Sequence, residues 1–371
     1  MSTLKCSNVQ HASAASPAIV LASDGTATAQ LSSLNGGALS GARNRIINGD
    51  MRISQRGTSF ATLDPAADTY TLDRWAFKGA GTTGRATISQ DTDVPNNTFT
   101  STLKAVVTTA DSSIASGDGA WITQNIEGFN ARDLIGTTFT LSFWVKSPKT
   151  GIHCVSFGNA SSNRSFVSEY TVNSANTWEQ KSVTVAGGLI TAGTWDWTNG
   201  KGLSVNFALI VGSTFQTTAG AWQTGNFFGT SNQVNVFDSL ANSFLLGGVQ
   251  LEAGSVATPF ERRSYGQELA LCQRYFYQMT NRMLGFTLAG ANTQSHVYTT
   301  GSFGFPVTMR AAPTLASGAA FTMESGSNGT VALNPSVSFV TTVDAPVIYN
   351  SGANWNNLNY CRVTAGFSAE L

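Results

Sequence analysis

The octapeptide TFTLSFWV at residues 138–145 decides the fold class of this chain. Phe139, Leu141, Phe143 and Val145 occupy every second position, so in an extended strand they all point to one side. Polar side chains fill most of the positions between them. A period of two is typical of a β-strand with one face buried in a core and the other face turned outward.

The same pattern recurs, between stretches rich in Gly, Asn, Ser and Thr, from residue 46 to about residue 262. KSVTV at 181–185 and LSVNFALI at 203–210 are two further examples. Many short strands separated by turns predict two packed sheets, here a jelly-roll β-sandwich over residues 46–262. No fixed-length internal repeat is present, which argues against a β-helix or a propeller.

Residues 1–45 precede the sandwich and are rich in Ala, Ser, Thr and Gly. The run at 18–22 favours a short strand, and Asp24-Gly25 follows it as a turn signal. A segment this small and weakly apolar does not fold alone. It is either a disordered tail or an extended attachment segment that docks onto another protein or onto copies of itself. The need to bury the apolar residues 19–21 favours attachment.

One helix is expected, in a connecting segment at residues 263–280. Ser264 and Gln267 have the spacing of a capping box. The apolar residues that follow repeat at helical spacing, which predicts a helix from Tyr265 to about Met279. That stripe consists of Cys272, Tyr275, Phe276 and Met279. It covers the helix's own domain or lies at a subunit interface. Residues 281–371 return to β-character and form a small C-terminal β-domain, which the last run at 363–371 would close.

The amino-acid composition limits the classes of function that we expect for this protein. The 371 residues include 21 Lys and Arg and 21 Asp and Glu, so charged residues make up 11% and the net charge is zero. An average globular protein has roughly 25%. A nearly uncharged surface is usual for extracellular or virion-borne β-proteins, and it argues against nucleic-acid binding. No apolar run approaches the ~20 residues of a membrane helix, so we expect no membrane insertion. The N-terminus lacks the apolar core of a secretion signal, and we expect exposure outside the cell to follow lysis.

No residue pattern indicates a cofactor, a metal or a catalytic centre. The cysteines, Cys6, Cys154, Cys272 and Cys361, are far apart and form no CxxC pair. They are interpreted as buried free thiols, and a disulfide stays open. The histidines have no metal-ligand spacing, and neither a P-loop nor a nucleophile elbow is present. A pair of carboxylates that converges only in three dimensions stays open as a glycosidase site.

Four segments carry a resemblance to a known family. They are NRIINGDMRISQRG at 44–57, YTLDRWAF at 70–77, the stretch at 248–276 that begins GVQLEAG, and FPVTMRAAPT at 305–314. In this order they resemble bacteriophage tail fibre and receptor-binding proteins with a carbohydrate-binding-module-like jelly-roll domain. The resemblance implies a homotrimer, attachment to a phage tail or baseplate protein through the N-terminal segment, and location in the virion. It does not itself imply enzymatic activity.

Within these segments, the residues themselves favour structural roles. Asn48-Gly49-Asp50 predicts a turn before a strand. Trp75 is expected in the core because apolar residues flank it in a strand-like run. Related jelly rolls often bind calcium near their first and last strands. Asp50 and Glu252 are the available carboxylates here, but Arg52 beside them disfavours a cation, so no metal is predicted.

Aromatic side chains next to amides are the candidates for glycan binding. Trp195 and Trp197 would share one face if their segment were a strand. Trp222, next to Gln223, is a second candidate. The third is a C-terminal set, ranked first because the distal end of a fibre usually meets the host: Trp355, Asn356, Asn357 and Tyr349. For each of them, packing in a core or a subunit interface is the competing interpretation.

The resulting hypothesis is a tail fibre adhesin that binds a host cell-surface glycan or protein without enzymatic activity. Three weak sites on one trimer would add avidity. A structural virion protein, such as a head fibre or a baseplate or tail component, is the first alternative. A glycan depolymerase is the second.

Overall fold

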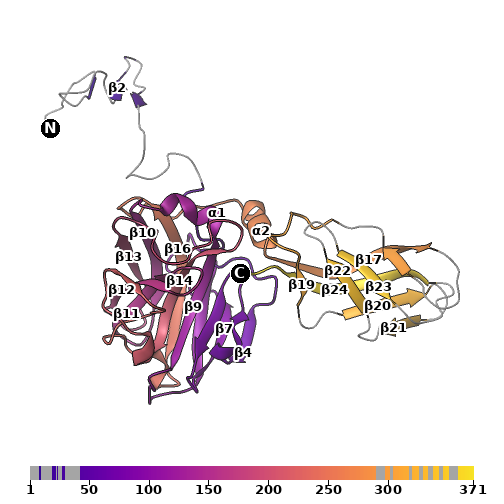
Figure 1. Cartoon of the computed structure of the whole chain (residues 1–371), viewed down its shortest axis with the longest axis horizontal. Coiled ribbons are helices and arrows are strands. Elements are labelled where there is room, and N and C mark those ends of the chain that lie inside the picture. Colours follow the sequence, from indigo (N-terminus) through magenta and orange to yellow (C-terminus); the bar gives the residue numbers. More distant parts are fainter. Residues whose placement is uncertain are drawn as a thin grey trace.

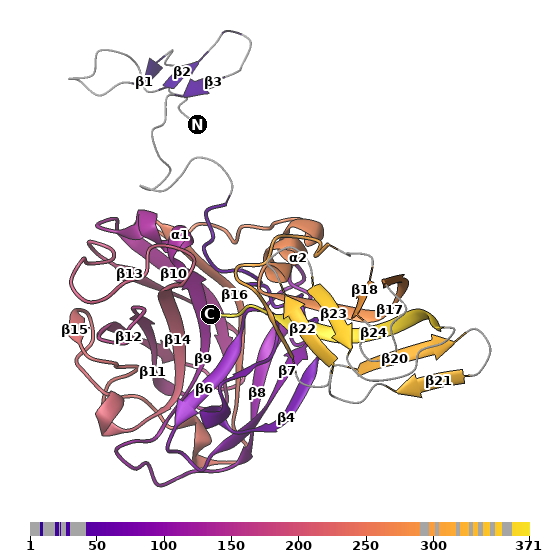
Figure 2. The same cartoon turned by 45° about the vertical axis from the view of Figure 1, so that its right-hand side comes forward.

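The computed structural model describes residues 42–289, 297–300, 304–316 and 358–371, together with short strands within 1–41 and 317–350. Side chains are described mainly for residues 42–280, 304–316 and 364–371. As predicted, the protein is mainly β. A large sandwich and a smaller C-terminal sheet lie side by side, and helix α2 stands at their junction (Figures 1 and 2).

The sandwich consists of a six-stranded and a seven-stranded antiparallel sheet. In spatial order, the six-stranded sheet contains β13 (Glu179–Val185), β10 (Phe139–Lys146), β16 (Ser243–Ala253), β8 (Thr102–Thr109), β7 (Arg85–Asp91) and β4 (Ser59–Leu63). The seven-stranded sheet contains β15 (Trp222–Thr224), β12 (Arg164–Val172), β11 (Gly151–Gly158), β14 (Lys201–Val211), β9 (Gly119–Glu127), β6 (Ala76–Ala80) and β5 (Thr69–Tyr70). The chain passes back and forth between the two sheets, which confirms the jelly roll.

Short helices lie in the loops of the sandwich. They are η1 (Pro65–Ala67), α1 (Gly128–Ala131), η2 (Arg132–Leu134), η3 (Ser213–Phe215) and η4 (Val236–Asp238).

Aromatic residues from both sheets meet in the core. Phe143 of β10 lies edge-on to Phe207 of β14 with ring centroids 5.0 Å apart, and Phe139 meets Phe157 in the same way at 5.2 Å. Edge-to-face contacts of this kind contribute beyond simple burial. The alternation read at 138–145 is confirmed, because its four apolar residues are fully buried. Trp75 is also completely buried, as predicted.

The turn predicted at Asn48 joins two of the motifs that carried the resemblance. The amide of Met51 donates to the Asn48 carbonyl, and Asn48 has a left-handed φ of 57°. The Asn48 side chain donates to the carbonyls of Ile53 and Asp73, while the Trp75 indole donates to the Asn48 carbonyl at 3.0 Å. The asparagine therefore pins residues 44–57 to residues 70–77.

Helix α2 (Tyr265–Gln273) begins where predicted, and Ser264 and Gln267 form the capping box. The predicted end at Met279 was wrong, and so was a helical segment reaching residue 280. The helix ends at Gln273, six residues before Met279, and β17 (Phe276–Ala289) begins three residues later, because Phe276 pairs with Ser368 of β24 and strand pairing replaces the helix.

The stripe nevertheless stays buried. Cys272 and Tyr275 pack against Ile47 and Ile53 of the same chain. The sequence left open whether the stripe covers its own domain or lies at a subunit interface. The part of the stripe formed by Cys272 and Tyr275 covers its own domain.

The C-terminal sheet has the order β18 (Val297–Thr300), β17, β24 (Leu358–Ser368), β20 (Ala320–Ser325) and β21 (Gly329–Ala332), with β19 (Thr314–Leu315) also paired to β24. The last strand of the chain thus lies in the middle of this sheet, between β17 and β20. β22 (Val337–Thr341) pairs with β23 (Pro346–Asn350). Near the N-terminus, β1 (Asn8–Val9), β2 (Ile19–Leu21) and β3 (Ala27–Ala29) pair in a small sheet, and the turn signal at 24–25 lies outside the described residues.

Two of the thiol predictions can be examined. Cys154 and Cys272 are buried free thiols, as expected. Cys6 lies outside the described residues, and so does the side chain of Cys361. Within the described part of the chain, no helix is long and apolar enough to cross a membrane.

Buried polar contacts fasten the C-terminal sheet to the sandwich. Glu370, which follows β24, pairs with Arg74 and lies 3.1 Å from Arg56. On the other side of the junction, Glu127 accepts hydrogen bonds from Arg274 at 2.6 Å and from the Tyr275 hydroxyl at 2.7 Å. The segment just before β17 and the segment just after β24 are therefore both held to the sandwich by ion pairs.

The loop that joins β12 of the seven-stranded sheet to β13 of the six-stranded sheet should be sensitive to acid. Glu179 accepts hydrogen bonds from the amides of Asn173 and Ser174 and from Lys181. Burial alone would raise the pKa of Glu179, but these bonds outweigh it and lower the pKa to about 2. A depressed pKa stabilises the folded state above the ordinary value of 4.5, and that stabilisation is lost as the pH falls towards 2.

We therefore expect Glu179→Gln to lower the free energy of unfolding by about 1–2 kcal/mol at pH 7. At pH 2 the variant and the wild type should be nearly equal. Urea unfolding at the two pH values measures the difference, and an equal deficit at both would contradict this role for the carboxylate.

Candidate functional site

The outer face of the seven-stranded sheet carries an ordered set of polar side chains. In β9 the residues Ala120, Ile122 and Ile126 point into the core. The alternate residues must therefore point outward, and β14 follows the same rule. Because β9, β14 and β11 are neighbours in the sheet, their outward residues align in rows across the strands.

Three such rows differ in chemistry. Register places Thr123 beside Asn206 and Asn206 beside Ser156, which makes a polar row. On one side of it Asn125, Ser204 and Gly158 form a second polar row. On the other side an apolar row consists of Trp121, Ala208 and Cys154.

Hydrogen bonds hold the polar rows in place. The Thr123 hydroxyl donates to Asn206 Oδ1 at 2.7 Å, and Asn206 Nδ2 lies 3.2 Å from Ser156 Oγ and 3.3 Å from Ser204 Oγ. Asn125 donates to the Leu371 carbonyl at 2.7 Å, which closes this end of the row. Fixed side chains lose little further rotamer freedom when a ligand binds, which favours recognition by preorganised groups.

An aromatic wall covers the apolar row. Trp121 stacks on Phe228 with ring centroids 3.6 Å apart and planes 12° apart, and Phe215 meets it edge-on at 5.9 Å. Phe215 and Phe228 belong to the loop between β14 and β16, which folds back over the sheet. Trp121 is only 8% exposed, so it forms the side of a recess and not an open platform.

Beside this wall, on the outer face of the sheet, lies a groove of about 260 Å³. Its lining, called the sheet groove below, is dominated by amides, hydroxyls and two lysines. It consists of Asp68, Lys78, Gly79, Trp121, Thr123, Asn125, Gly158, Asn159, Ser162, Lys201, Ser204, Asn206, Asn226 and Phe228.

The charges in the sheet groove are loosely balanced. Lys78 Nζ lies 3.5 Å from Asp68, whose side chain is 58% exposed. Lys201 forms no ion pair with any described residue. Burial lowers the pKa of Lys201, and the neighbouring Lys78 lowers it further. The lining thus holds two cations against one exposed carboxylate.

This arrangement suits binding better than catalysis. Amides and hydroxyls can both donate to and accept from the hydroxyls of a polar ligand. Glycoside hydrolysis by the usual route needs two carboxyl groups on either side of the bond that breaks. Asp68 is the only carboxylate among the lining residues of the sheet groove.

The structure brings three of the predicted tryptophans together. Trp195 and Trp197 lie in a loop, and their rings stack at 5.0 Å and 8°. Trp222 of β15 meets Trp195 edge-on at 5.7 Å. A shared face was expected for Trp195 and Trp197 only if their segment were a strand. The segment is not a strand, and the two rings stack on each other instead.

This tryptophan cluster closes the edge of the core. All three rings are half-buried and pack against the main core. The Trp195 indole donates to the Ala192 carbonyl and the Trp222 indole to the Gly188 carbonyl, each at 3.0 Å. Their faces and donors are therefore largely used inside the chain. The cluster borders the sheet groove, because Asn159 donates to the Thr194 carbonyl at 2.8 Å.

The C-terminal candidates stay a prediction. Trp355, Asn356 and Asn357 lie outside the described residues, and so does the side chain of Tyr349, whose backbone lies in β23.

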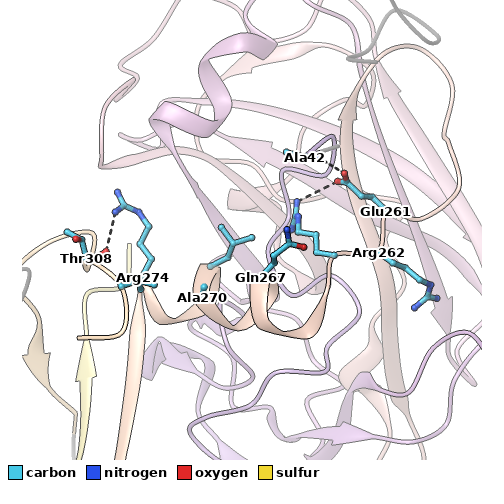
Figure 3. A pocket seen from close by; sticks show the side chains of 10 residues that line it. Ala42, Glu261, Arg262, Gln267, Ala270, Arg274 and Thr308 are labelled. Atoms are coloured by element: carbon cyan, nitrogen blue, oxygen red, sulfur yellow. Dashed lines mark hydrogen bonds and ion pairs between the residues drawn. The ribbon is translucent and has the colours of Figure 1, made fainter. Parts of the chain in front are cut away.

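A second, larger cavity of about 800 Å³ lies at the junction beside α2 (Figure 3). Ala270 and Leu271 of the helix and Val307 give it an apolar lining, and arginines surround it. Those arginines already have partners. Arg263 donates to the Ile46 carbonyl at 3.1 Å, Arg262 to Thr98 at 2.8 Å, and Arg274 to Glu127 and the Thr308 carbonyl. The cavity therefore offers no uncommitted charged group, and the sheet groove is the better candidate.

The carboxylates considered for calcium are also engaged within the chain. Asp50 lies 2.9 Å from Arg52. Glu252 accepts hydrogen bonds from Gln250 at 2.8 Å and from the amide and hydroxyl of Thr258. Glu252 thereby holds the loop that follows the last sandwich strand.

Sequence reasoning missed the sheet groove because it treated alternation only as a sign of burial. In the run at 203–210 the residues between the apolar ones include Ser204 and Asn206. In the run at 119–127 the corresponding alternate positions hold Trp121, Thr123 and Asn125. An aromatic and several amides on the outward face of adjacent strands are the signal that could have found the site.

Comparison with known proteins gives weak likenesses in fold. No protein-family model and no curated protein matches the sequence. Among solved structures, the tailspike protein 4 enzymatically active domain of bacteriophage CBA120 is 17% identical with a TM-score of 0.29, covering 58% of this chain and only 22% of its own length. A putative sugar-binding protein from Bacteroides thetaiotaomicron is 13% identical with a TM-score of 0.34, covering 57% and 99%. A family 11 carbohydrate-binding module from Clostridium thermocellum is 11% identical with a TM-score of 0.28, covering 54% and 99%. At TM-scores this low, the description of the fold depends on the chain's own sheets.

Proposed function

We propose that this protein is a non-enzymatic glycan-binding adhesin and that its sandwich binds sugar in the sheet groove. The observation that carries the proposal is the double polar row across β9, β14 and β11, flanked by Trp121 and Phe228. Sugars present many hydroxyls and a few apolar C–H faces, and the lining offers complementary amides, hydroxyls and aromatic edges.

A volume of about 260 Å³ lies just below the ~300–1,000 Å³ usual for ligand pockets. The sheet groove therefore suits one or two units of a longer chain. Shallow single sites of this kind bind weakly, and several copies on one particle would convert weak binding into avidity.

The setting that we propose is a phage tail fibre. The sequence supports it through the four motifs between residues 44 and 314, which occur in the order of tail fibre and receptor-binding proteins. On this proposal the protein assembles as a homotrimer in the virion and is attached through residues 1–45. It meets its host glycan after release by lysis.

Filling the sheet groove should abolish glycan binding. Asn226 is exposed and lines the groove, so Asn226→Trp blocks it without disturbing the core. We expect at least a tenfold weaker affinity, about 1.4 kcal/mol, for a host surface polysaccharide measured by calorimetry with the whole chain. The matched control is Asn97→Trp on an exposed loop between β7 and β8, which should bind like the wild type.

Other results would redirect the proposal. Binding that survives Asn226→Trp but is lost in Trp355→Ala would move the site to the C-terminal candidates. If the wild type binds no host glycan and does not block infection, a structural virion protein is the better description. New reducing ends after incubation with the polysaccharide would make the protein a depolymerase.

A further inference from the structure

The two lysines that line the sheet groove, Lys78 and Lys201, indicate which class of glycan it binds. Lys201 is the first residue of β14, and Lys78 lies in β6 across β9. Both line the cavity whose floor includes Asn125 and Asn206. An ammonium group pointing into a half-enclosed recess needs a counter-charge from the protein, from water or from a ligand.

The protein does not supply that counter-charge to Lys201. Its register partner in β9 is Glu127, an acid that could have paired with it. The Glu127 carboxylate instead accepts hydrogen bonds from Arg274 at 2.6 and 3.1 Å and from the Tyr275 hydroxyl at 2.7 Å. It is 2% exposed and fully committed to the junction with α2.

Lys78 is only partly neutralised. Its single ion pair among the described residues is with Asp68 at 3.5 Å, a long contact to a carboxylate that is mostly in solvent. Exposed pairs of this kind contribute little. Two lysines and one aspartate leave the lining with a formal charge of +1, although the whole protein has no net charge.

Resting on the proposed function, we infer that the sheet groove selects an acidic glycan and that Lys201, assisted by Lys78, binds the carboxylate of a uronic-acid-type sugar unit. The amides of the polar rows would hold the neutral hydroxyls of the same unit. The lowered pKa of Lys201 agrees with a cation that lacks an anionic partner, and a bound carboxylate would relieve the repulsion between the two lysines. Charge-assisted hydrogen bonds to a carboxylate are about twice as strong as neutral ones.

The test compares sugars that differ only in charge. The probes are galacturonate oligomers and glucuronate-containing oligosaccharides, each beside its carboxyl-reduced, neutral counterpart, together with a panel of neutral bacterial oligosaccharides. The whole chain should bind at least one acidic probe on the order of tenfold more tightly than its reduced counterpart. That ratio should fall as salt is added.

Lys201→Gln keeps a polar side chain without the charge and should move the ratio towards one, because affinity for the acidic probe falls more than affinity for the reduced probe. The matched control is Lys104→Gln on β8, whose partner is Asp91 at 3.0 Å outside the groove. It should keep the full preference. Circular dichroism checks that both variants are folded.

The outcomes separate the two claims. Equal binding of acidic and reduced probes, or a preference that survives in Lys201→Gln, overturns the acidic specificity and leaves glycan binding intact. Binding of neutral probes alone also overturns it. If no probe binds the wild type, the proposed function itself fails, and the specificity falls with it.

Discussion

Replacing Arg74 by methionine is expected to lower the free energy of unfolding by about 3–5 kcal/mol, because it breaks a buried ion pair. The Arg74 side chain is 1% exposed and that of Glu370 is 5% exposed. The guanidinium also lies over the Tyr275 ring at 3.5 Å and donates to the Asn125 carbonyl. Without it, Glu370 keeps only Arg56 as a cation partner, at 3.1 Å.

Urea unfolding followed by tryptophan fluorescence measures the change. A double-mutant cycle with Glu370→Gln isolates the pair, and the double variant should be more stable than the sum of the two single losses predicts. The control is Arg85→Met, whose partner Asp64 is 42% exposed, and which should change stability by no more than about 1 kcal/mol. A similar small change for Arg74→Met would show that the pair does not hold the junction.

Replacing Phe207 by alanine should cost about 3–5 kcal/mol, because it opens a cavity at the centre of the sandwich. The ring is fully buried and lies between Phe143 and Trp75, with centroids 5.0 and 6.3 Å away. Phe143 lies in β10, whose backbone is held by sheet pairing, and Trp75 lies just before β6 in a turn held by backbone hydrogen bonds to Thr71 and Leu72, so the gap cannot close easily.

Phe129→Ala makes the same chemical change at a ring that is 60% exposed, so it serves as the matched control. It should shift the unfolding free energy by less than about 0.5 kcal/mol. Equal effects of the two substitutions would mean that this core is not the main source of stability. Because Phe207 and Asn206 are adjacent in β14, the core variant should also loosen the polar rows and weaken glycan binding.

Both predictions concern how the sheet groove is held. Its floor is one face of a sheet whose other face is the core, so packing within the sandwich sets the position of every groove side chain. The Arg74–Glu370 pair holds the residues after β24 against the sandwich, where the Leu371 carbonyl accepts from Asn125 and from the Tyr70 hydroxyl. The residues that follow β24 thereby help to hold Asn125, one of the side chains that line the groove.

The class of structure follows from local patterns in the amino-acid sequence. Apolar residues at every second position identified strands such as β10 and β14, and the capping box identified the start of α2, because these signals depend on neighbours within a few residues. The buried position of Trp75 was predictable from its apolar flanks in the same way.

The places where outward-facing residues meet depend instead on contacts between distant parts of the chain. The end of α2 was misjudged because Phe276 pairs with Ser368, which lies far away in sequence. The sheet groove depends on the register that aligns Thr123 with Asn206 and Asn206 with Ser156. Local sequence does not encode such pairings, since strand order and register come from packing the whole sandwich. For the same reason, the sequence did not reveal that Glu127 pairs with Arg274 and so leaves Lys201 without a counter-charge.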